Sequence, residues 1–169
     1  MELKQKYEQL LKQAIPTITE TKQSMLNGFR NQGAENFTKL GIPSKSDENW
    51  LYTNLEPTFS KNWTLETKGI DTKVDINSVF RCDVPNLDTH IALVFNGHYF
   101  DNNTQLPDGI IMGSLAQMST KYPEILKKYL FKTASEEHKM ASLNAALAAD
   151  GFFLYIPKNV RLEKPLQIV

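Results

Sequence analysis

The sequence predicts an α+β fold in which helices come first, a small β region with a hairpin follows, further helices come next, and strands return at the end. Three observations support this class. Apolar residues recur at helical spacing over residues 1–15, the dipeptide Asn96-Gly97 separates two β-rich runs, and apolar residues alternate with their neighbours from Phe152 onward. The helical and β signals occupy different stretches, which is typical of an α+β protein.

The N-terminal segment, residues 1–41, is predicted to be a helical cap. Tyr7 and its apolar neighbours lie on one face of an amphipathic helix, with Lys and Glu opposite, and Pro16 is expected to end that helix. A second helix is expected to end at Gly33 and a short third helix at Gly41, since glycine readily adopts the left-handed conformation that closes helices.

Residues 42–150 are predicted to form a mixed α/β connector and hairpin region. Its first part, "GIPSKSDENWLYTNLEP", reads as a shaped loop with one turn of helix that starts at Ser46 or Asp47, and with a closing proline at Pro57. The pieces "WTLET" and "VDINSVF" that follow favour short strands.

A tight turn at Asn96-Gly97 is predicted to join two antiparallel strands, because both residues tolerate the positive φ angles of a primed turn. A two-residue turn pairs Phe95 with His98. Side chains alternate between the faces of a strand, so His90 and His98 are expected on opposite faces, where they cannot share a metal ion.

Three further helices are expected before the chain returns to β structure. The strand "GIIMG" is predicted to end at Ser114, which forms a capping box with Gln117 at the start of the first of them. The second follows Pro123. Ser135 is expected to cap the third, which Gly151 would end.

The last segment, residues 151–169, is predicted to hold two strands. One alternating run begins at Phe152, and after a break at residues 157–159 a second run continues from Val160 to the last residue. An unpaired apolar strand invites association. We therefore expect the terminal strand either to pair with another copy of the chain or to lie under its own N-terminal helices.

Composition excludes several classes of function. The chain has 19 Lys and Arg against 19 Asp and Glu, so its formal net charge is zero and no global field attracts nucleic acid. No apolar stretch is long enough to span a bilayer, and the N-terminus lacks the pattern of a secretory signal, so a cytoplasmic location without membrane partners is expected. Cys82, the single cysteine, is expected to be an ordinary structural or surface thiol.

The four lysines of the late helical region are interrupted by glutamates and are interpreted as a solvated helix face; they are Lys121, Lys127, Lys128 and Lys132.

No catalytic, cofactor-binding or metal-binding residues are predicted, because the known nucleotide, hydrolase and zinc motifs do not occur. Two alternatives stay open. Asp47 and Glu48 would serve a small stand-alone enzyme together with a histidine. Trp50, Tyr52 and Trp63 would offer stacking platforms to a carbohydrate, or contacts in a protein-binding module.

Two stretches carry a resemblance to a known family. "LGIPSKSDENWLYTNLEP" and "LNAALAADGFFLYIPKNVRLEKPLQIV" resemble segments of the SufB/SufD family of iron-sulfur cluster assembly proteins, and the Trp-Tyr-Thr pattern of the first is similar to the SufD branch. The matching positions, to which we assign a structural role, are Pro43, Glu48, Trp50, Tyr52, Thr53, Asn144, Asp150, Gly151, Ile156, Pro157 and Pro165.

The resemblance implies a non-catalytic scaffold subunit of the SUF complex, with SufB and the ATPase SufC as partners of the full-length protein. It also implies that the iron-sulfur cluster and ATP are handled by the wider complex and not by cofactor sites in this chain. On this view residues 151–169 are the first strands of a β-helix core, and the chain is the N-terminal portion of a longer protein, truncated at Val169.

Overall fold

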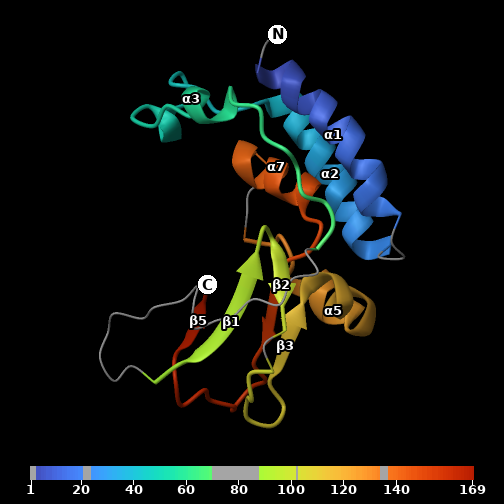
Figure 1. Ribbon diagram of the computed structural model, residues 1–169, viewed down its shortest axis with the longest axis vertical. Helices are drawn as coiled ribbons and strands as arrows, with labels where there is room; N and C mark the ends of the chain where they lie inside the picture. Colours follow the sequence, from blue (N-terminus) through green and yellow to red (C-terminus); the bar gives the residue numbers. More distant parts are fainter. Residues whose placement is uncertain (1–2, 21–23, 70–87, 102, 134–136) are drawn as a thin grey trace. The chain divides into compact units, whose positions relative to one another are not determined.

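The computed structural model describes residues 3–20, 24–69, 88–101, 103–133 and 137–169 (Figure 1). They form an α+β protein, as predicted. The chain divides into two compact units, each made of two separate segments. Unit 1 comprises Met1–Thr67 and Tyr122–Ala148, and unit 2 comprises Lys68–Lys121 and Ala149–Val169. The predicted division into residues 1–41, 42–150 and 151–169 follows the order of the elements and stays a prediction.

Unit 1 is helical. Two long helices lie side by side in it, and α7 packs against them (Figure 1). Its described elements are α1 (Leu3–Thr19), α2 (Ser24–Leu40), the 3-10 turn η1 (Glu48–Trp50), α3 (Glu56–Phe59), α6 (Pro123–Tyr129) and α7 (Lys139–Leu147).

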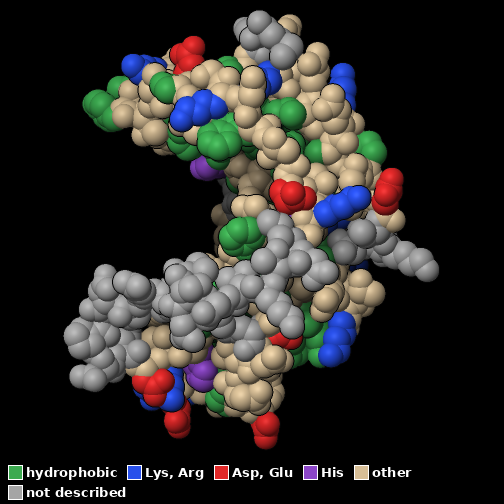
Figure 2. Space-filling view, in the orientation of Figure 1, with side chains coloured by type: hydrophobic (Ala, Val, Ile, Leu, Met, Phe, Trp, Pro, Cys, Tyr) green, Lys and Arg blue, Asp and Glu red, His purple; other side chains and the backbone are tan. Residues whose placement is uncertain are grey.

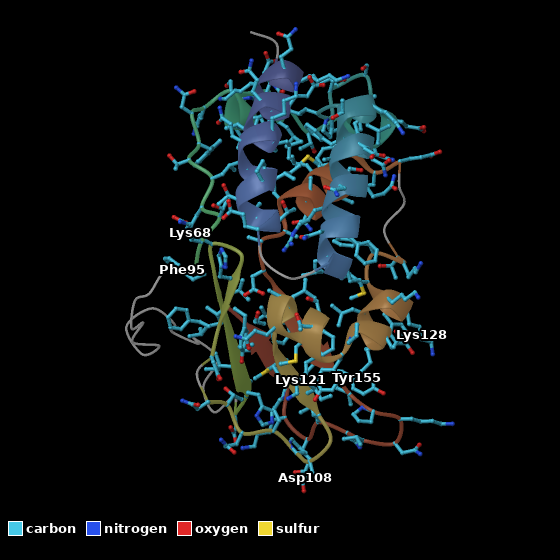
Figure 3. The ribbon with its side chains drawn as sticks, turned by 90° about the vertical axis from the view of Figure 1, so that its right-hand side faces the viewer. Lys68, Phe95, Asp108, Lys121, Lys128 and Tyr155 are labelled. Atoms are coloured by element: carbon cyan, nitrogen blue, oxygen red, sulfur yellow. The ribbon has the colours of Figure 1, made fainter. Side chains whose placement is uncertain are left out.

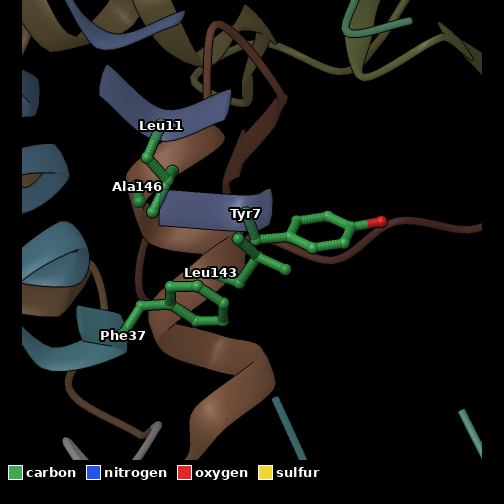
Figure 4. Packing of buried hydrophobic residues seen from close by; sticks show 5 residues of the cluster. All are labelled: Tyr7, Leu11, Phe37, Leu143 and Ala146. Atoms are coloured by element: carbon green, nitrogen blue, oxygen red, sulfur yellow. The ribbon is translucent and has the colours of Figure 1, made fainter. Parts of the chain in front are cut away.

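The core of unit 1 forms where these three helices meet. Tyr7 and Leu11 of α1, Phe37 of α2, and Leu143 and Ala146 of α7 are all buried in one cluster (Figure 4). Burying a large apolar side chain stabilises a fold by about 1.5–3 kcal/mol. Residues far apart in the sequence therefore hold unit 1 together, and the predicted apolar face of the first helix is confirmed.

The prediction that Pro16 ends the first helix is wrong. α1 continues through Pro16 to Thr19, and the Pro16 carbonyl still accepts a hydrogen bond from the Glu20 N–H at 3.1 Å. Pro16 lies in the last turn, where its missing N–H removes a single helical hydrogen bond. Ile18, which is buried beyond it, offsets that loss.

The predicted helix end at Gly33 is also wrong, because the second and third predicted helices are one continuous helix, α2. Gly33 is buried in the middle of α2. The cap at Gly41 is confirmed: this residue has φ 71°, and its N–H donates to the Phe37 carbonyl at 2.7 Å. One glycine therefore ends the helix, whereas the other lies inside it.

The described residues of unit 2 form two small sheets and one short helix. The three-stranded sheet has the order β2-β1-β5, and the two-stranded sheet pairs β3 with β4. The elements are β1 (His90–Phe95), β2 (His98–Phe100), β3 (Ile111–Ser114), α5 (Leu115–Lys121), β4 (Phe152–Tyr155) and β5 (Leu166–Ile168).

The predicted hairpin is confirmed in type and register. Phe95 pairs with His98 across an antiparallel ladder, and Leu93 pairs with Phe100. Asn96 has φ 47° and Gly97 φ 81°, the two positive values that a primed turn requires.

The terminal strands pair with different partners. β4 runs antiparallel to β3, whereas β5 runs parallel to β1, with His90 opposite Leu166. Val160 lies in a turn instead of a strand, because its N–H donates to the Pro157 carbonyl at 3.2 Å and Asn159 has φ 66°. The ladder partner of the last strand is thus β1, and its pairing with another copy of the chain stays a prediction.

The start of α5 confirms the predicted cap, since the Gln117 N–H donates to the Ser114 hydroxyl at 3.2 Å. The limits predicted for the last helix are wrong. α7 starts after His138, whose Nδ1 accepts the Ala141 N–H at 3.2 Å, and it ends at Leu147, short of Gly151. An imidazole nitrogen here fills the place usually taken by a serine or aspartate oxygen.

Some sequence predictions fall on residues outside the described ranges. These are the Ser135 cap, the piece "VDINSVF" and Cys82. The piece "WTLET" is described and forms no strand. Among the described helices, none is both long and apolar enough to cross a membrane.

Candidate functional site

The first group of candidate residues lies in a loop between α2 and α3, residues 41–55, here called the motif loop. Asp47 fixes its shape. The Asp47 carboxylate accepts hydrogen bonds from the Ser44 N–H at 2.7 Å and the Ser44 hydroxyl at 3.2 Å, and it forms an ion pair with Lys139 of α7 at 2.6 Å. The hydrogen bond from Lys139, and then the one from the Ser44 N–H, hold the pKa of Asp47 below its ordinary value.

Backbone hydrogen bonds wind the middle of the motif loop into η1. The Trp50 N–H donates to the Asp47 carbonyl at 2.8 Å, and the Thr53 N–H donates to the Trp50 carbonyl at 2.9 Å. The Trp50 ring is half-buried and meets the edge of the His138 ring, with centroids 6.3 Å apart. The predicted turn of helix is therefore confirmed, and α7 supports it at two points, Lys139 and His138.

The side chains of the motif loop divide into anchors and exposed groups. Pro43 is buried, whereas Glu48 and Thr53 are exposed. The Tyr52 side chain is 97% exposed and that of Leu51 is 48% exposed. Figure 2 shows hydrophobic side chains among charged ones on the surface over the α3 segment. Large apolar groups on a fixed backbone are typical of a contact surface for another protein.

A second set of contacts, between α1 and the end of α3, was not predicted from the sequence. Lys6 of α1 donates to three successive carbonyls at the end of α3, those of Phe59 at 3.4 Å, Ser60 at 2.9 Å and Lys61. The Tyr7 and Phe59 rings pack with centroids 5.1 Å apart. A cation at a helix C-terminus satisfies carbonyls that have no partner within the helix. The helical spacing of apolar residues predicted that Tyr7 faces the core, but nothing in the sequence indicated the role of Lys6.

The helix α3 also corrects the interpretation of Pro57. This proline does not close the loop but lies in the first turn of α3, where a missing N–H costs nothing. The Glu56 N–H donates to the Asn54 side chain at 3.1 Å just before it.

The second group of candidate residues centres on Asp150 in unit 2. Asp150 Oδ1 accepts the Ser114 hydroxyl at 2.7 Å and the Ala116 N–H at 2.9 Å, and its Oδ2 accepts the Tyr99 N–H at 3.0 Å. One carboxylate thus caps α5 and ties β2 to the segment before β4. Hydrogen bonds to an ionised carboxylate are stronger than those between neutral groups, so these three bonds hold α5 and β2 in place.

The other motif residues around β4 and β5 also serve the backbone. The Gly151 carbonyl accepts the Leu115 N–H at 2.8 Å, and the Pro165 carbonyl accepts the His90 N–H at 2.9 Å. Pro157 begins the turn before Val160, and Ile156 is exposed. Asn144 is exposed on α7 and belongs to unit 1. The structure brings the candidates together as two anchored groups, one in each unit.

The geometry does not favour the enzyme alternative. The Asp47 carboxylate is occupied by Lys139 and Ser44, and its lowered pKa keeps it ionised, which suits an anchor better than a general acid. In the described ranges, no three or more His, Cys, Asp or Glu side chains gather closely enough to hold a metal ion.

The aromatic residues considered for carbohydrate binding differ in their surroundings. Trp50 is packed on His138, Tyr52 projects into solvent, and Trp63 donates its ring N–H to the Thr58 carbonyl at 2.8 Å. Lys61 lies over the Trp63 ring at 5.9 Å from its centroid. Nothing in this arrangement supports the carbohydrate alternative.

The fold and its two anchored groups define an α+β domain whose motif residues shape a loop and the start of a sheet. The family described as SufBD protein N-terminal region matches residues 1–168. The chain belongs to the SufBD family, whose members are named as iron-sulfur cluster assembly proteins.

Comparisons with individual proteins agree with this family. The chain is 29% identical over 155 residues to the iron-sulfur cluster assembly protein SufD of Bacillus subtilis, which covers 85% of this chain and 34% of that protein. It is 29% identical over 158 residues to a SufBD family protein of Arabidopsis thaliana, and this alignment covers 82% of this chain and 34% of that protein. It is 23% identical over 171 residues to a SufBD family protein of Synechocystis, and this alignment covers 99% of this chain and 37% of that protein. The chain thus spans about a third of the length of these relatives.

Proposed function

We propose that this chain is the N-terminal part of a SufD-like scaffold subunit of the SUF iron-sulfur cluster assembly complex. The observation that carries the proposal is the family match over residues 1–168, together with the similarity to the Bacillus subtilis protein named SufD. The role is non-catalytic and cytoplasmic. In support of it, the candidate side chains with the most hydrogen bonds, Asp47 and Asp150, anchor loops.

In this role the full-length protein pairs with SufB and contacts SufC, and the wider complex handles the iron-sulfur cluster and ATP. Residues 151–169 then begin a β-helix core. Of its two strands, β5 supports this part of the proposal because it pairs in parallel with β1, as strands of a parallel β-helix do, whereas β4 pairs antiparallel with β3.

The motif loop is the part of this chain that we assign to partner contact. Leu51 and Tyr52 present apolar surface on a backbone held by the Asp47–Lys139 ion pair and the Thr53 hydrogen bond. Pre-organised side chains lose little conformational entropy when a partner binds.

Co-purification tests two parts of the proposal, membership of the SUF complex and partner contact through the motif loop. The full-length protein is expressed with its SufB and SufC counterparts, and the complex is isolated through a tag on SufC. We expect all three to co-elute. Failure of the unaltered protein to join either partner would overturn the assignment to the complex.

The loop is tested with the double variant Leu51→Ser and Tyr52→Ser, which we expect to lower recovery of the complex at least tenfold. Phe95→Ser is the control, because Phe95 is 44% exposed, close to the 48% of Leu51, but lies in the hairpin. Circular dichroism establishes that each variant is folded. Undiminished recovery of the double variant would remove the loop from the interface while leaving the family role intact.

A further inference from the structure

The chain contains two asparagine-glycine pairs, Asn27-Gly28 in α2 and Asn96-Gly97 in the turn of the hairpin. In such a pair the glycine nitrogen can attack the asparagine side chain, because glycine has no side chain that hinders the approach. Every other asparagine of the chain precedes a residue with a side chain. The two pairs are therefore the candidates for this chemistry, and their surroundings differ.

Asn27 is held at both ends of its side chain amide. The amide oxygen accepts a hydrogen bond from the guanidinium of the buried Arg30 at 2.6 Å, and the amide nitrogen donates to the Thr19 carbonyl at 3.2 Å. Gly28 lies within α2, where helical geometry directs its N–H to the carbonyl four residues earlier. The two groups are thus kept from reacting with each other while α2 is folded.

Asn96 lacks these restraints. Asn96 and Gly97 are both exposed, and in the described part of the chain no hydrogen bond joins the Asn96 side chain or the Gly97 N–H. A Cβ placed on Gly97 would meet nothing within 4 Å, so the space beside its nitrogen is open. The turn can be followed in Figure 3, directly beyond the labelled Phe95.

The turn also lies in a part of the sheet that opens at low cost. β2 is three residues long and lies at one end of the strand order β2-β1-β5. Short elements with few contacts open locally at a smaller free energy than a buried core does. Opening releases Asn96 from its φ of 47°, a value that residues with side chains adopt rarely, and lets its side chain reach the Gly97 nitrogen.

We propose that Asn96 is a site of spontaneous covalent modification. The Gly97 nitrogen loses its proton and attacks Asn96 Cγ, a C–N bond forms, and the side chain nitrogen takes up that proton and leaves as ammonia. The resulting five-membered succinimide ring then adds one water molecule. Opening at one ring carbonyl gives aspartate, and opening at the other gives isoaspartate, in which the main chain runs through the side chain of residue 96. The inference goes beyond the proposed function and does not depend on it.

The products alter the hairpin. Both add a negative charge at the turn, and isoaspartate also adds one atom to the main chain. A two-residue turn pairs Phe95 with His98 through two positive φ values, and a longer main chain does not fit this geometry. The Tyr99 N–H stays bound to Asp150 at 3.0 Å. We therefore expect isoaspartate to open the ladder at its turn end, next to His98.

Peptide mapping by mass spectrometry tests the proposal on the 169-residue chain. The folded chain is incubated at mildly alkaline pH, where more of the attacking nitrogen is deprotonated, and the modified forms of the Asn96 and Asn27 peptides are followed with time. We expect modification at Asn96 at least tenfold faster than at Asn27. In urea both pairs are expected to react at similar rates, because the hydrogen bonds of Asn27 are lost.

Three results of this experiment would overturn the proposal. The first is that Asn96 stays intact in the folded chain over the time in which it reacts in urea. The second is that the two pairs react equally fast in the folded chain. The third is a tenfold difference that persists in urea, since it would assign the selectivity to the neighbouring sequence and not to the folded structure.

Gly97→Ala tests the attacking nitrogen. The added methyl group hinders the approach, so modification at Asn96 is expected to be at least tenfold slower, with the rate at Asn27 unchanged. The substitution also strains the turn at φ 81°, but strain would open the turn and speed the reaction. A slower rate is therefore due to the side chain itself, and an unchanged rate would contradict the mechanism.

Hydrogen exchange on the purified isoaspartate form tests the effect on the hairpin. The His98 amide is expected to exchange at least several-fold faster than in the unmodified chain, and amides in the middle of α2 at their original rate. Asn96→Asp is the matched control, because it adds the charge without the extra main-chain atom. Equal exchange of His98 in the isoaspartate form and the control would contradict the expected opening of the ladder.

Discussion

Gly33 of α2 lies so close to Ala145 of α7 that a Cβ placed on the glycine would stand 2.8 Å from the Cβ of Ala145. The same Cβ would stand 2.8 Å from the Ala146 nitrogen and from the Ser142 carbonyl oxygen. These neighbours include backbone, which cannot rotate away. A hydrogen in place of a side chain therefore lets α2 and α7 touch along the buried core.

Gly33→Ala is accordingly expected to lower the free energy of unfolding by about 1–3 kcal/mol, the usual cost of overpacking. Gly28→Ala in the same helix is the matched control, because a Cβ there meets nothing within 4 Å. That control is expected to raise stability by up to about 1 kcal/mol through helix propensity. Urea unfolding of both variants measures the difference, and equal effects would contradict this packing.

Asp150→Ala removes the acceptor of three hydrogen bonds and leaves the Ala116 and Tyr99 N–H groups without it. We expect a loss of about 3 kcal/mol, since hydrogen bonds to a charged group each contribute about 1.5–3 kcal/mol and solvent replaces part of them. Urea unfolding measures the loss. Asp108→Ala, at an exposed turn, is the control and should change stability little. If the two substitutions proved equivalent, Asp150 would not anchor α5.

The Asp47–Lys139 ion pair predicts a dependence of stability on pH. The pKa of Asp47 is lowered in the folded protein, so its stabilising effect is fully present above the ordinary carboxyl value of about 3.9 and is lost as the pH falls through the lowered value. NMR titration of the Asp47 carboxyl carbon should show a midpoint below that ordinary value. In Lys139→Met the midpoint should move up, because the hydrogen bond from Lys139 is the largest cause of the shift. A midpoint unchanged by this substitution would assign the shift to Ser44 instead.

The hairpin could be predicted to the residue because its register depends on local chemistry. Asn96 and Gly97 both accept positive φ, and a two-residue turn leaves one register. The ends of helices were harder, because tertiary packing decides them. Glycine often follows the last residue of a helix, so Gly33 was expected to end one. In the structure its lack of a side chain lets α2 pass close to Ala145, and the helix continues.

The candidate site could be predicted in part. The motif positions came from resemblance. The turn of helix after Asp47 was predicted from cap chemistry, and the turn is present, but the Asp47 side chain makes no cap hydrogen bond and binds Ser44 and Lys139 instead. The anchors that come from distant parts of the chain, Lys6 and Lys139, have no local signal, since the sequence does not show which carbonyl or carboxylate a lysine meets. Arg30 is a similar case: it is buried and donates to the Ala148 carbonyl at 2.8 Å, although arginine is usually exposed.

Lys6→Met is expected to loosen α3 without unfolding unit 1. The methionine keeps most of the apolar stem but loses the donors to the Phe59, Ser60 and Lys61 carbonyls. Those carbonyls then depend on solvent, so the Ser60 N–H, which donates to the Glu56 carbonyl at 2.9 Å, should exchange with deuterium several-fold faster. Amides in the middle of α2 should exchange at their original rate. Lys12→Met, on an exposed position of α1, is the matched control and should alter neither set. Uniform acceleration across both helices would mean that Lys6 stabilises unit 1 as a whole, and unchanged exchange at Ser60 would mean that the Tyr7–Phe59 ring contact holds α3 without it.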